Sequence, residues 1–366
     1  MTAPRVLIMA GGTGGHVYPA LAVAEELRLR GWMIDWVGTQ RGLESRVVPE
    51  HGIELHTLPV RGLRGKGILA RVSGVLRLGL AMIASLALVA RLKPDAALGM
   101  GGYAAGPAGL AMRVWRRPLV IHEQNAVAGT TNRLLAPFAN RILCGFEGAF
   151  SAPRIVEVVG NPVRDSIFLQ TAEKHYPERF TPERPLRLLV LGGSLGSAPI
   201  NNAVPAAVSN LLDSAPDAPV TIRHQCGESH FAATQGLYAE LAQAVTVIRF
   251  IEDMADAYRW ADLVICRAGA LTVSELAATG TPAILVPLPH AIDDHQTRNA
   301  EVLSAVGAAE LLPQRDISDT VLADRLNRFL RHPERLKDMS VSARSLSPAA
   351  ATRRVADVVE EVAHVA

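Results

Sequence analysis

The sequence has only three cysteines, Cys144, Cys226 and Cys266, which are far apart and include no CxxC pair. Neither a disulfide framework nor a zinc site of the usual spacing can be built from them, and this usage favours a reducing compartment. The apolar stretch at the N-terminus is short and runs into glycines, so no signal peptide is expected. We therefore expect a cytoplasmic protein, and its 366 residues suggest two domains.

Long hydrophobic runs are also missing. The longest uncharged run within residues 68–93, Leu78–Ala90, has 13 residues, whereas a membrane-spanning helix needs about 20. Two apolar stripes nevertheless follow helical spacing here. The first consists of Leu69, Val72, Leu76, Leu80, Ile83 and Ala87, and the second of Val75, Leu78, Met82, Leu86 and Val89. One stripe would pack on a sheet. The other either lies on lipid or is buried within a large domain.

Acidic residues are scarce in the first half of the chain. Residues 1–166 hold 19 Lys+Arg against 11 Asp+Glu, a net of +8, and the remaining residues hold 18 against 24, a net of −6. Between Arg61 and Arg117 there are ten basic residues and one acidic residue, Asp95. This asymmetry predicts an anionic partner. Because the basic residues flank the apolar stripes, we expect an anionic membrane surface and not a nucleic acid.

Apolar, β-rich runs alternate with helical patterns, which is typical of parallel βαβ units. Candidate strands in the first half are Val6–Ala10, Ile34–Val37, Ala96–Leu98, Leu119–His122, Ile142–Cys144 and Val156–Val159. The polar, proline-rich residues 161–185 are interpreted as a linker. The pattern restarts at Leu186–Ser197, with further candidates at Val220–Arg223, Val245–Ile248, Leu263–Cys266 and Ala283–Val286. This predicts an α/β fold of two doubly wound domains around a cleft.

Three glycine loops each follow a candidate strand: GGTGGH (Gly11–His16), GMGGYAAGP (Gly99–Pro107) and GGSLGS (Gly192–Ser197). A strand, a glycine turn and a helix N-terminus bind anions, because free N–H groups and the helix dipole converge there. No GxxxxGK[ST] run occurs, which excludes a P-loop. Val17 stands where a dinucleotide fingerprint has its third glycine, and Gly38 and Thr39 stand in place of its acid, so NAD or FAD is disfavoured and no cofactor is expected.

The segment RAGALTVSELAATGTPAILVPLPHAIDDHQTRNA, residues 267–300, narrows the choice of ligand. Glu275 lies near the start of a predicted helix, where a carboxylate can accept hydrogen bonds from a ribose diol while neighbouring backbone amides bind phosphate. The alternative is structural, since Thr272 and Glu275 also have the spacing of a capping box, which needs no ligand.

These residues match a known family. The motifs GGTGGHVYPALAVA, GGYAAGP, HEQNAVAGTTNR, GNPVR, LGGSLGS, the residue 267–291 stretch and DDHQTRNA resemble those of the bacterial transferases that convert lipid I to lipid II in peptidoglycan synthesis. The resemblance runs from Gly11 to Ala300. The family's second-domain loop usually reads GGSQGA, and here Leu195 and Ser197 replace the glutamine and the alanine.

The resemblance implies the GT-B architecture of two Rossmann-like domains and a division of labour between them. Residues 1–162 would form an acceptor- and membrane-binding domain, residues 163–346 a UDP-sugar-binding domain, and residues 347–366 a helix packed back on the first domain. The implied reaction is an inverting transfer of N-acetylglucosamine from UDP-N-acetylglucosamine to the 4-hydroxyl of the N-acetylmuramyl unit of lipid I. The protein would act at the cytoplasmic face of the inner membrane.

His16 is the predicted general base, because the positive end of a helix dipole disfavours its imidazolium form. The alternative is a capping histidine that only orders the glycine loop. Glu123 and Asn125 follow a strand end and are further catalytic candidates, while His122 is equally well a core histidine. The resemblance assigns substrate contacts to Thr13, Gly14, Gly15, Tyr103, Asn125, Arg164, Ser194, Ile251, Ala270, Leu271, Thr272, Val273, Ser274, Glu275, Gln296 and Asn299.

Within that set, the resemblance places Ser194 and Thr272 on phosphate, Glu275 on ribose, and Gln296 with Asn299 on the sugar hydroxyls. Arg164 and the Ile251 backbone would lie by the uracil, although Arg164 has a simple ion-pair alternative with Asp165. No DxD motif or ligand cluster is found, so no metal site is expected. The alternative function is another GT-B UDP-sugar enzyme, a glycolipid glycosyltransferase or an epimerase.

Overall fold

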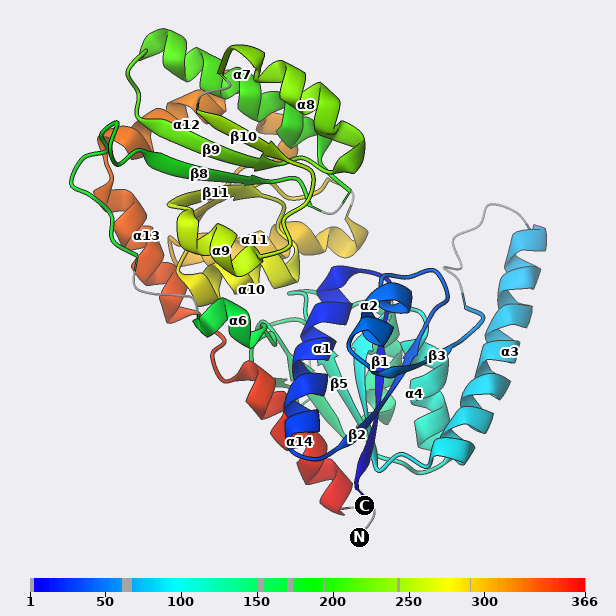
Figure 1. Ribbon diagram of the computed structural model, residues 1–366. Helices are drawn as coiled ribbons and strands as arrows, with labels where there is room; N and C mark the ends of the chain where they lie inside the picture. Colours follow the sequence, from blue (N-terminus) through cyan, green and yellow to red (C-terminus); the bar gives the residue numbers. More distant parts are fainter. Residues whose placement is uncertain are drawn as a thin grey trace. The chain divides into compact units, whose positions relative to one another are not determined.

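The computed structural model describes residues 3–60, 68–150, 155–169, 174–193, 195–241, 244–289 and 291–365. The chain divides into two compact units (Figure 1). Unit 1 consists of Met1–Arg164 together with Pro348–Ala366, and unit 2 of Asp165–Ser347.

Unit 1 is built on a seven-stranded parallel sheet with the order β3-β2-β1-β4-β5-β6-β7. Its strands are β1 (Arg5–Ala10), β2 (Met33–Gly38), β3 (Glu54–Thr57), β4 (Ala96–Gly101), β5 (Leu119–Glu123), β6 (Arg141–Cys144) and β7 (Glu157–Val158). Its helices are α1 (Gly14–Leu29), α2 (Glu44–Glu50), α3 (Ile68–Leu92), α4 (Ala105–Val114), α5 (Thr130–Leu135), η1 (Ala136–Phe138) and α14 (Ala351–Val365).

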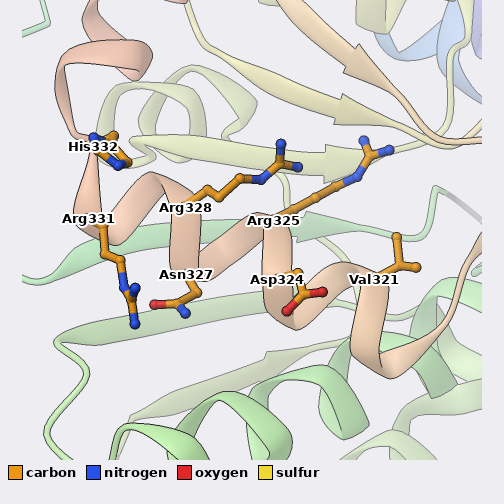
Figure 2. A pocket seen from close by; sticks show the side chains of 7 residues that line it. All are labelled: Val321, Asp324, Arg325, Asn327, Arg328, Arg331 and His332. Carbon is orange, nitrogen blue, oxygen red and sulfur yellow. The ribbon is translucent and has the colours of Figure 1, made fainter.

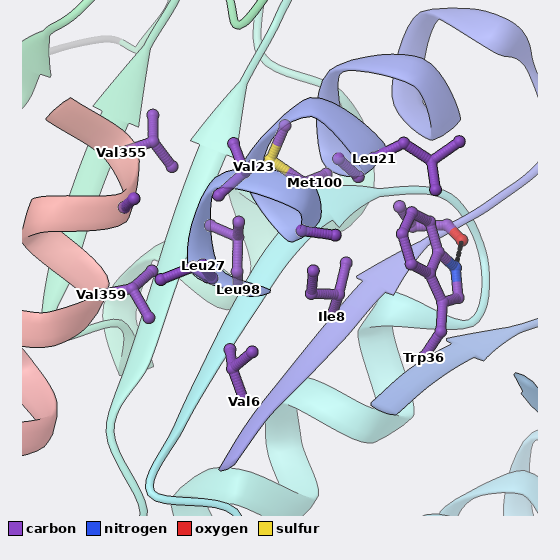
Figure 3. Close-up of a cluster of buried hydrophobic side chains, with 14 of the residues drawn as sticks. Val6, Ile8, Leu21, Val23, Leu27, Trp36, Leu98, Met100, Val355 and Val359 are labelled. Atoms are coloured by element: carbon purple, nitrogen blue, oxygen red, sulfur yellow. Dashed lines mark hydrogen bonds between the residues drawn. The ribbon is translucent and has the colours of Figure 1, made fainter. Parts of the chain in front are cut away.

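Each face of this sheet is covered by its own set of helices, because successive side chains of a strand point to opposite faces. Val6 and Ile8 of β1 pack with α1, α2 and α14, as Figure 3 shows for Val355 and Val359. Leu7 and Met9 point the other way and pack with α3, α4 and α5. Each face of the sheet therefore has its own cluster of buried apolar side chains.

The C-terminal helix α14 is tied to α1 by polar contacts as well as by packing. Arg30 donates to Asp357 at 2.7 Å and to Glu360 at 2.8 Å. The indole N–H of Trp32 donates to Glu360 at 3.0 Å. The last helix of the chain therefore completes the core of unit 1.

Unit 2 is built on a six-stranded parallel sheet with the order β10-β9-β8-β11-β12-β13. Its strands are β8 (Leu186–Leu191), β9 (Val220–Gln225), β10 (Val245–Ile248), β11 (Leu263–Cys266), β12 (Ala283–Leu285) and β13 (Ala309–Leu311). Its helices are α6 (Asp165–Leu169), α7 (Ala198–Ser214), η2 (Glu228–His230), α8 (Phe231–Leu237), η3 (Ala239–Leu241), α9 (Met254–Trp260), α10 (Ala270–Thr279), η4 (Ile292–Asp294), α11 (His295–Ala305), η5 (Gln314–Asp316), α12 (Asp319–Arg331) and α13 (Glu334–Ser345).

All predicted strands are confirmed, whereas β3 and β13 were not predicted. Both are short edge strands that carry polar residues, so they lack the apolar run that marks an inner strand. The interpretation of residues 161–185 as a plain linker is wrong in part. The segment contains α6, and it buries Val163 and Phe180 in the two units' own interiors.

Candidate functional site

The loops after β1 and β4 meet in unit 1. These two strands are neighbours in the sheet, and the strand order reverses between them, which is where doubly wound folds bind ligands. A Cβ at Gly102 would lie 2.5 Å from the carbonyl oxygen of Gly11, and one at Gly101 would lie 3.0 Å from the His16 ring. Both glycines also have positive φ. GGTGGH and GMGGY therefore form one surface, with Thr13, Gly14 and Gly15 beside the exposed Tyr103.

His16 is the third residue of α1, and Thr13 is the N-cap. The alternative of a capping histidine is therefore wrong for this helix. The half-buried His16 side chain instead reaches β5, where its Nδ1 lies 2.8 Å from Oε1 of Gln124. Because Nδ1 makes this contact, Nε2 is the ring nitrogen that could exchange a proton with a substrate.

Glu123 is 1% exposed and accepts hydrogen bonds on both carboxylate oxygens. Oε1 accepts from the backbone and side-chain amides of Asn125, both at 3.0 Å, and Oε2 accepts from Gly129 N at 3.0 Å and from Asn132 at 2.8 Å. The four donors hold this buried carboxylate in place, so it is well arranged to position Asn125.

A further carboxylate, Glu44, supports the first glycine loop and was not singled out in the sequence. It is fully buried and accepts from Gly12 N and Thr39 N, both at 2.8 Å, and from the Thr39 hydroxyl at 2.7 Å. A Cβ at Gly11, Gly38 or Gly42 would collide with it. The sequence signal for Glu44 lies in those glycines, because their missing side chains leave room for a side chain from another segment.

In unit 2 the loops after β8 and β11 lie at the corresponding reversal of strand order. Gln225 holds the Gly192–Ser197 loop from both sides, because its Oε1 accepts from Gly193 N at 3.1 Å and its Nε2 donates to Gly193 O at 3.0 Å. Leu195, where the family has glutamine, is 85% exposed. Ser194 lies outside the described residues.

Helix α10 begins at Ala270 with Gly269 as its N-cap. Thr272 is thus inside the helix, and the capping-box alternative is wrong. Glu275 lies one turn further along than the sequence suggested, is 5% exposed and accepts from the Tyr258 hydroxyl at 3.0 Å. The first-turn N–H groups of Ala270, Leu271 and Thr272 have no carbonyl one turn back to bind, as at any helix start.

The remaining donor candidates have structural contacts of their own. Asn299 is fully buried and donates to Ala268 O at 3.1 Å, which holds the loop before α10. Gln296 is half-buried and accepts from Leu288 N at 2.9 Å. Arg164 lies in unit 1 with its guanidinium 5.2 Å from the centre of the Tyr18 ring. Ile251 is half-buried, and Val273 and Ser274 are buried in α10.

Helix α3 exposes most of its apolar surface. Leu76, Leu80 and Ile83 are 65%, 59% and 66% exposed, so the alternative of a helix buried on both sides is wrong for the described side chains. The buried face consists of Ala81, Ser85, Leu88 and Val89. Among the described residues no helix is both long and apolar enough to cross a bilayer.

The described residues contain one group of potential metal-ligating side chains, Asp35, Glu54 and His56, on β2 and β3. Asp35 accepts from Arg5 at 2.6 Å and is 2.8 Å from His56 Nε2. The Asp35 carboxylate is therefore already paired with the positive charge of Arg5. A hollow in unit 2, shown in Figure 2, lies along α12 and is lined by Val321, Asp324, Arg325, Asn327, Arg328, Arg331 and His332.

Two Rossmann-like units, each with a glycine loop at the reversal of its parallel sheet, make up the GT-B architecture. The chain belongs to glycosyltransferase family 28, whose N-terminal domain matches residues 6–144 and whose C-terminal domain matches residues 187–362. It is similar to proteins named UDP-N-acetylglucosamine--N-acetylmuramyl-(pentapeptide) pyrophosphoryl-undecaprenol N-acetylglucosamine transferase.

Identity to the relative from Stutzerimonas stutzeri is 50% over 99% of both chains. Identity to the relative from Pseudomonas paraeruginosa is 52% over 98% of this chain and 99% of the relative. A crystal structure of Acinetobacter baumannii MurG is 40% identical with a TM-score of 0.79, over 98% of this chain and 99% of that one. A UDP-N-acetylglucosamine 2-epimerase from Listeria monocytogenes is 16% identical with a TM-score of 0.66, over 97% of this chain and 95% of that one, which shows the fold alone.

Proposed function

We propose that this glycosyltransferase moves N-acetylglucosamine from UDP-N-acetylglucosamine to the 4-hydroxyl of the N-acetylmuramyl unit of lipid I, giving lipid II for the cell wall. The observation that carries the proposal is identity of 50% over nearly the whole chain to enzymes named for this transfer. The test is turnover of radiolabelled UDP-N-acetylglucosamine with a lipid I analogue. Failure to form the disaccharide lipid, with UDP-N-acetylglucosamine epimerised instead, would overturn it.

On the acceptor side, the oxygen of the 4-hydroxyl attacks the anomeric carbon of the donor N-acetylglucosamine. His16 Nε2 takes the hydroxyl proton in the same step. The bond from that carbon to the UDP oxygen breaks, and the configuration inverts. Asn125 orients the sugar and is itself held by Glu123. The surface formed by Thr13–Gly15 and Tyr103 binds the acceptor pyrophosphate through backbone N–H groups.

On the donor side, the α10 N-terminus and the Gly192–Ser197 loop bind the pyrophosphate and stabilise its charge as it leaves. Glu275 accepts from the ribose hydroxyls, and Tyr258 fixes the carboxylate. Gln296 and Asn299 contact the sugar hydroxyls, while Arg164 and the Ile251 backbone contact uracil. Of these contacts, the one from Glu275 is supported by the Tyr258 hydroxyl, which fixes the direction of the carboxylate near the start of α10.

The exposed face of α3 supports a place at the anionic cytoplasmic face of the inner membrane. Val114 and Trp115, at the end of α4, extend it, since the Trp115 indole donates to Leu86 O at 3.0 Å. Exposed basic side chains stand on the same two helices: Arg77, Arg91, Arg113 and Arg116. Apolar side chains surrounded by cations suit an interfacial helix on anionic lipid.

A further inference from the structure

A continuous series of hydrogen bonds in unit 1 runs from the backbone of Gly160 to the ring of His16. His122 Nε2 lies 2.9 Å from Gly160 O. Gln124 Nε2 lies 3.1 Å from His122 Nδ1 and 3.0 Å from His122 O. Gln124 Oε1 lies 2.8 Å from His16 Nδ1. The series joins the end of β5 to the first turn of α1.

The chemistry of the end groups fixes which atom donates in every step. A carbonyl oxygen only accepts, so His122 carries its proton on Nε2, and its Nδ1 accepts. The Gln124 end that faces this nitrogen and His122 O must be the NH₂ group, because both neighbours are acceptors. The other end is then the carbonyl oxygen, and His16 Nδ1 donates to it.

We propose that Gln124 is a positioning residue that holds neutral His16 in its Nδ1–H tautomer. Nε2 is then always the unprotonated nitrogen, the atom that takes the proton of the acceptor hydroxyl. The inference rests on the proposed function only where Nε2 accepts the proton of the acceptor hydroxyl. The tautomer itself follows from the hydrogen bonds.

The surroundings keep Gln124 from reversing its amide. Gln124 and His122 are 1% and 0% exposed, so solvent would not replace a lost side-chain hydrogen bond. A reversed amide would direct its oxygen at two acceptors in a buried site. Burial also lowers the pKa of His122 to about 4, so its ring stays neutral and keeps accepting at neutral pH.

The direct test is the ¹⁵N spectrum of the histidine rings in the full-length protein, without substrate, at a pH where His16 is neutral. The His16 signals are identified by their loss in His16→Gln. The wild-type protein should show a protonated Nδ1 and a bare Nε2. Gln124→Leu, which removes the acceptor but keeps the volume, should shift the ring toward the Nε2–H form. A wild-type Nε2–H ring, or an unchanged ring in Gln124→Leu, overturns the proposal.

His122→Phe is the matched control, because Gln124 Nε2 keeps its bond to the backbone oxygen of residue 122. The His16 tautomer should therefore survive in this variant, and its loss there would contradict the role given to Gln124. Gln124→Glu retains an oxygen facing His16 Nδ1 and should also keep the tautomer, with its second oxygen protonated so that it donates toward His122. If Gln124→Leu does not fold, the wild-type and Gln124→Glu spectra decide the question.

Steady-state kinetics distinguish a positioning role of Gln124 from a general disruption of the site. Gln124→Leu should lower kcat by about 10- to 100-fold, less than the full contribution of a general base, because the productive tautomer is still partly populated. KM for UDP-N-acetylglucosamine should stay unchanged, and Gln124→Glu should recover much of kcat. A rise in the donor KM with kcat intact overturns the positioning role. A wild-type protein without transfer activity refutes the proposed function but leaves the tautomer measurement valid.

Discussion

The Tyr258 hydroxyl donates to Oε2 of Glu275 at 3.0 Å, and both side chains are buried in unit 2. They lie on the helices α9 and α10, which precede and follow β11 in the chain. The bond fixes the direction of the carboxylate that we assign to the donor ribose.

Tyr258→Phe should raise KM for UDP-N-acetylglucosamine by up to about 10-fold and leave kcat nearly unchanged, since a hydrogen bond to a charged group contributes about 1.5 kcal/mol. Steady-state kinetics with varied donor measure this. The control is Tyr238→Phe, which loses a buried bond of 2.9 Å to His224 in the same unit. The ribose assignment of Glu275 fails if the two variants shift the donor KM equally.

His16→Ala should lower kcat by about 100- to 10,000-fold, the usual contribution of a general base. Affinity for the donor should change much less, because none of the proposed nucleotide contacts involves His16. The rate is measured at saturating acceptor, which removes effects on acceptor binding. Recovery of near wild-type turnover under saturation would leave His16 a role in ordering the loop only.

Excess chelator should leave turnover intact. The N–H groups at the starts of α7 and α10 are expected to stabilise the departing pyrophosphate in place of a cation. The measurement is the rate of radiolabel transfer with EDTA against the rate with added Mg²⁺. A rate that disappears with EDTA and returns with Mg²⁺ would show that the helix termini do not suffice.

Replacing Leu76, Leu80 and Ile83 with serine should abolish binding to anionic vesicles while thermal unfolding stays close to wild type, because these side chains are largely exposed. Binding of the wild-type protein should weaken with salt, since each basic residue near the surface contributes about 1 kcal/mol. Cosedimentation measures both. The matched control replaces three exposed apolar residues of unit 2, Leu237, Val306 and Val341. Equal loss of binding in both triple variants would remove α3 as the lipid face.

Stability should fall between pH 6.5 and pH 4 as the buried histidines are forced to charge. Burial lowers the pKa of His122 and that of His224 to about 4. Below the unfolded value of about 6.5 the unfolded chain binds protons that the folded chain refuses, so each histidine lowers the unfolding free energy by about 1.4 kcal/mol per pH unit. The contribution is complete above that pH. Urea unfolding at pH 7 and pH 5 checks this, and His122→Phe should reduce the slope. A slope that does not change in His122→Phe would contradict the buried, neutral ring.

Several elements could be predicted because their signals are local. An apolar run of four to six residues followed by glycines specifies an inner strand and its loop, and this was sufficient for β1, β4, β8 and β11. Residue types at those loops also indicated an anion site. His16 was found because it stands at a helix start directly after one of them.

The contacts that make the sites precise depend on residues far apart in the chain. His16 and Gln124 are separated by 108 positions, and Glu44 reaches Gly12 across 32. Neither pairing has a periodic signal, since it arises only when the sheet brings the ends of different strands together. The same reason explains why Thr272 was mistaken for a possible cap, because the helix start depends on where β11 ends.

The sequence by itself determined the two α/β units, their glycine loops and the family, because strand and turn preferences are properties of short segments. The tertiary structure alone decided which stripe of α3 faces out, which side chains join α14 to Arg30 and Trp32, and which nitrogen of His16 carries the proton. These outcomes depend on packing and on chains of hydrogen bonds between distant segments, and only the folded chain brings those segments together.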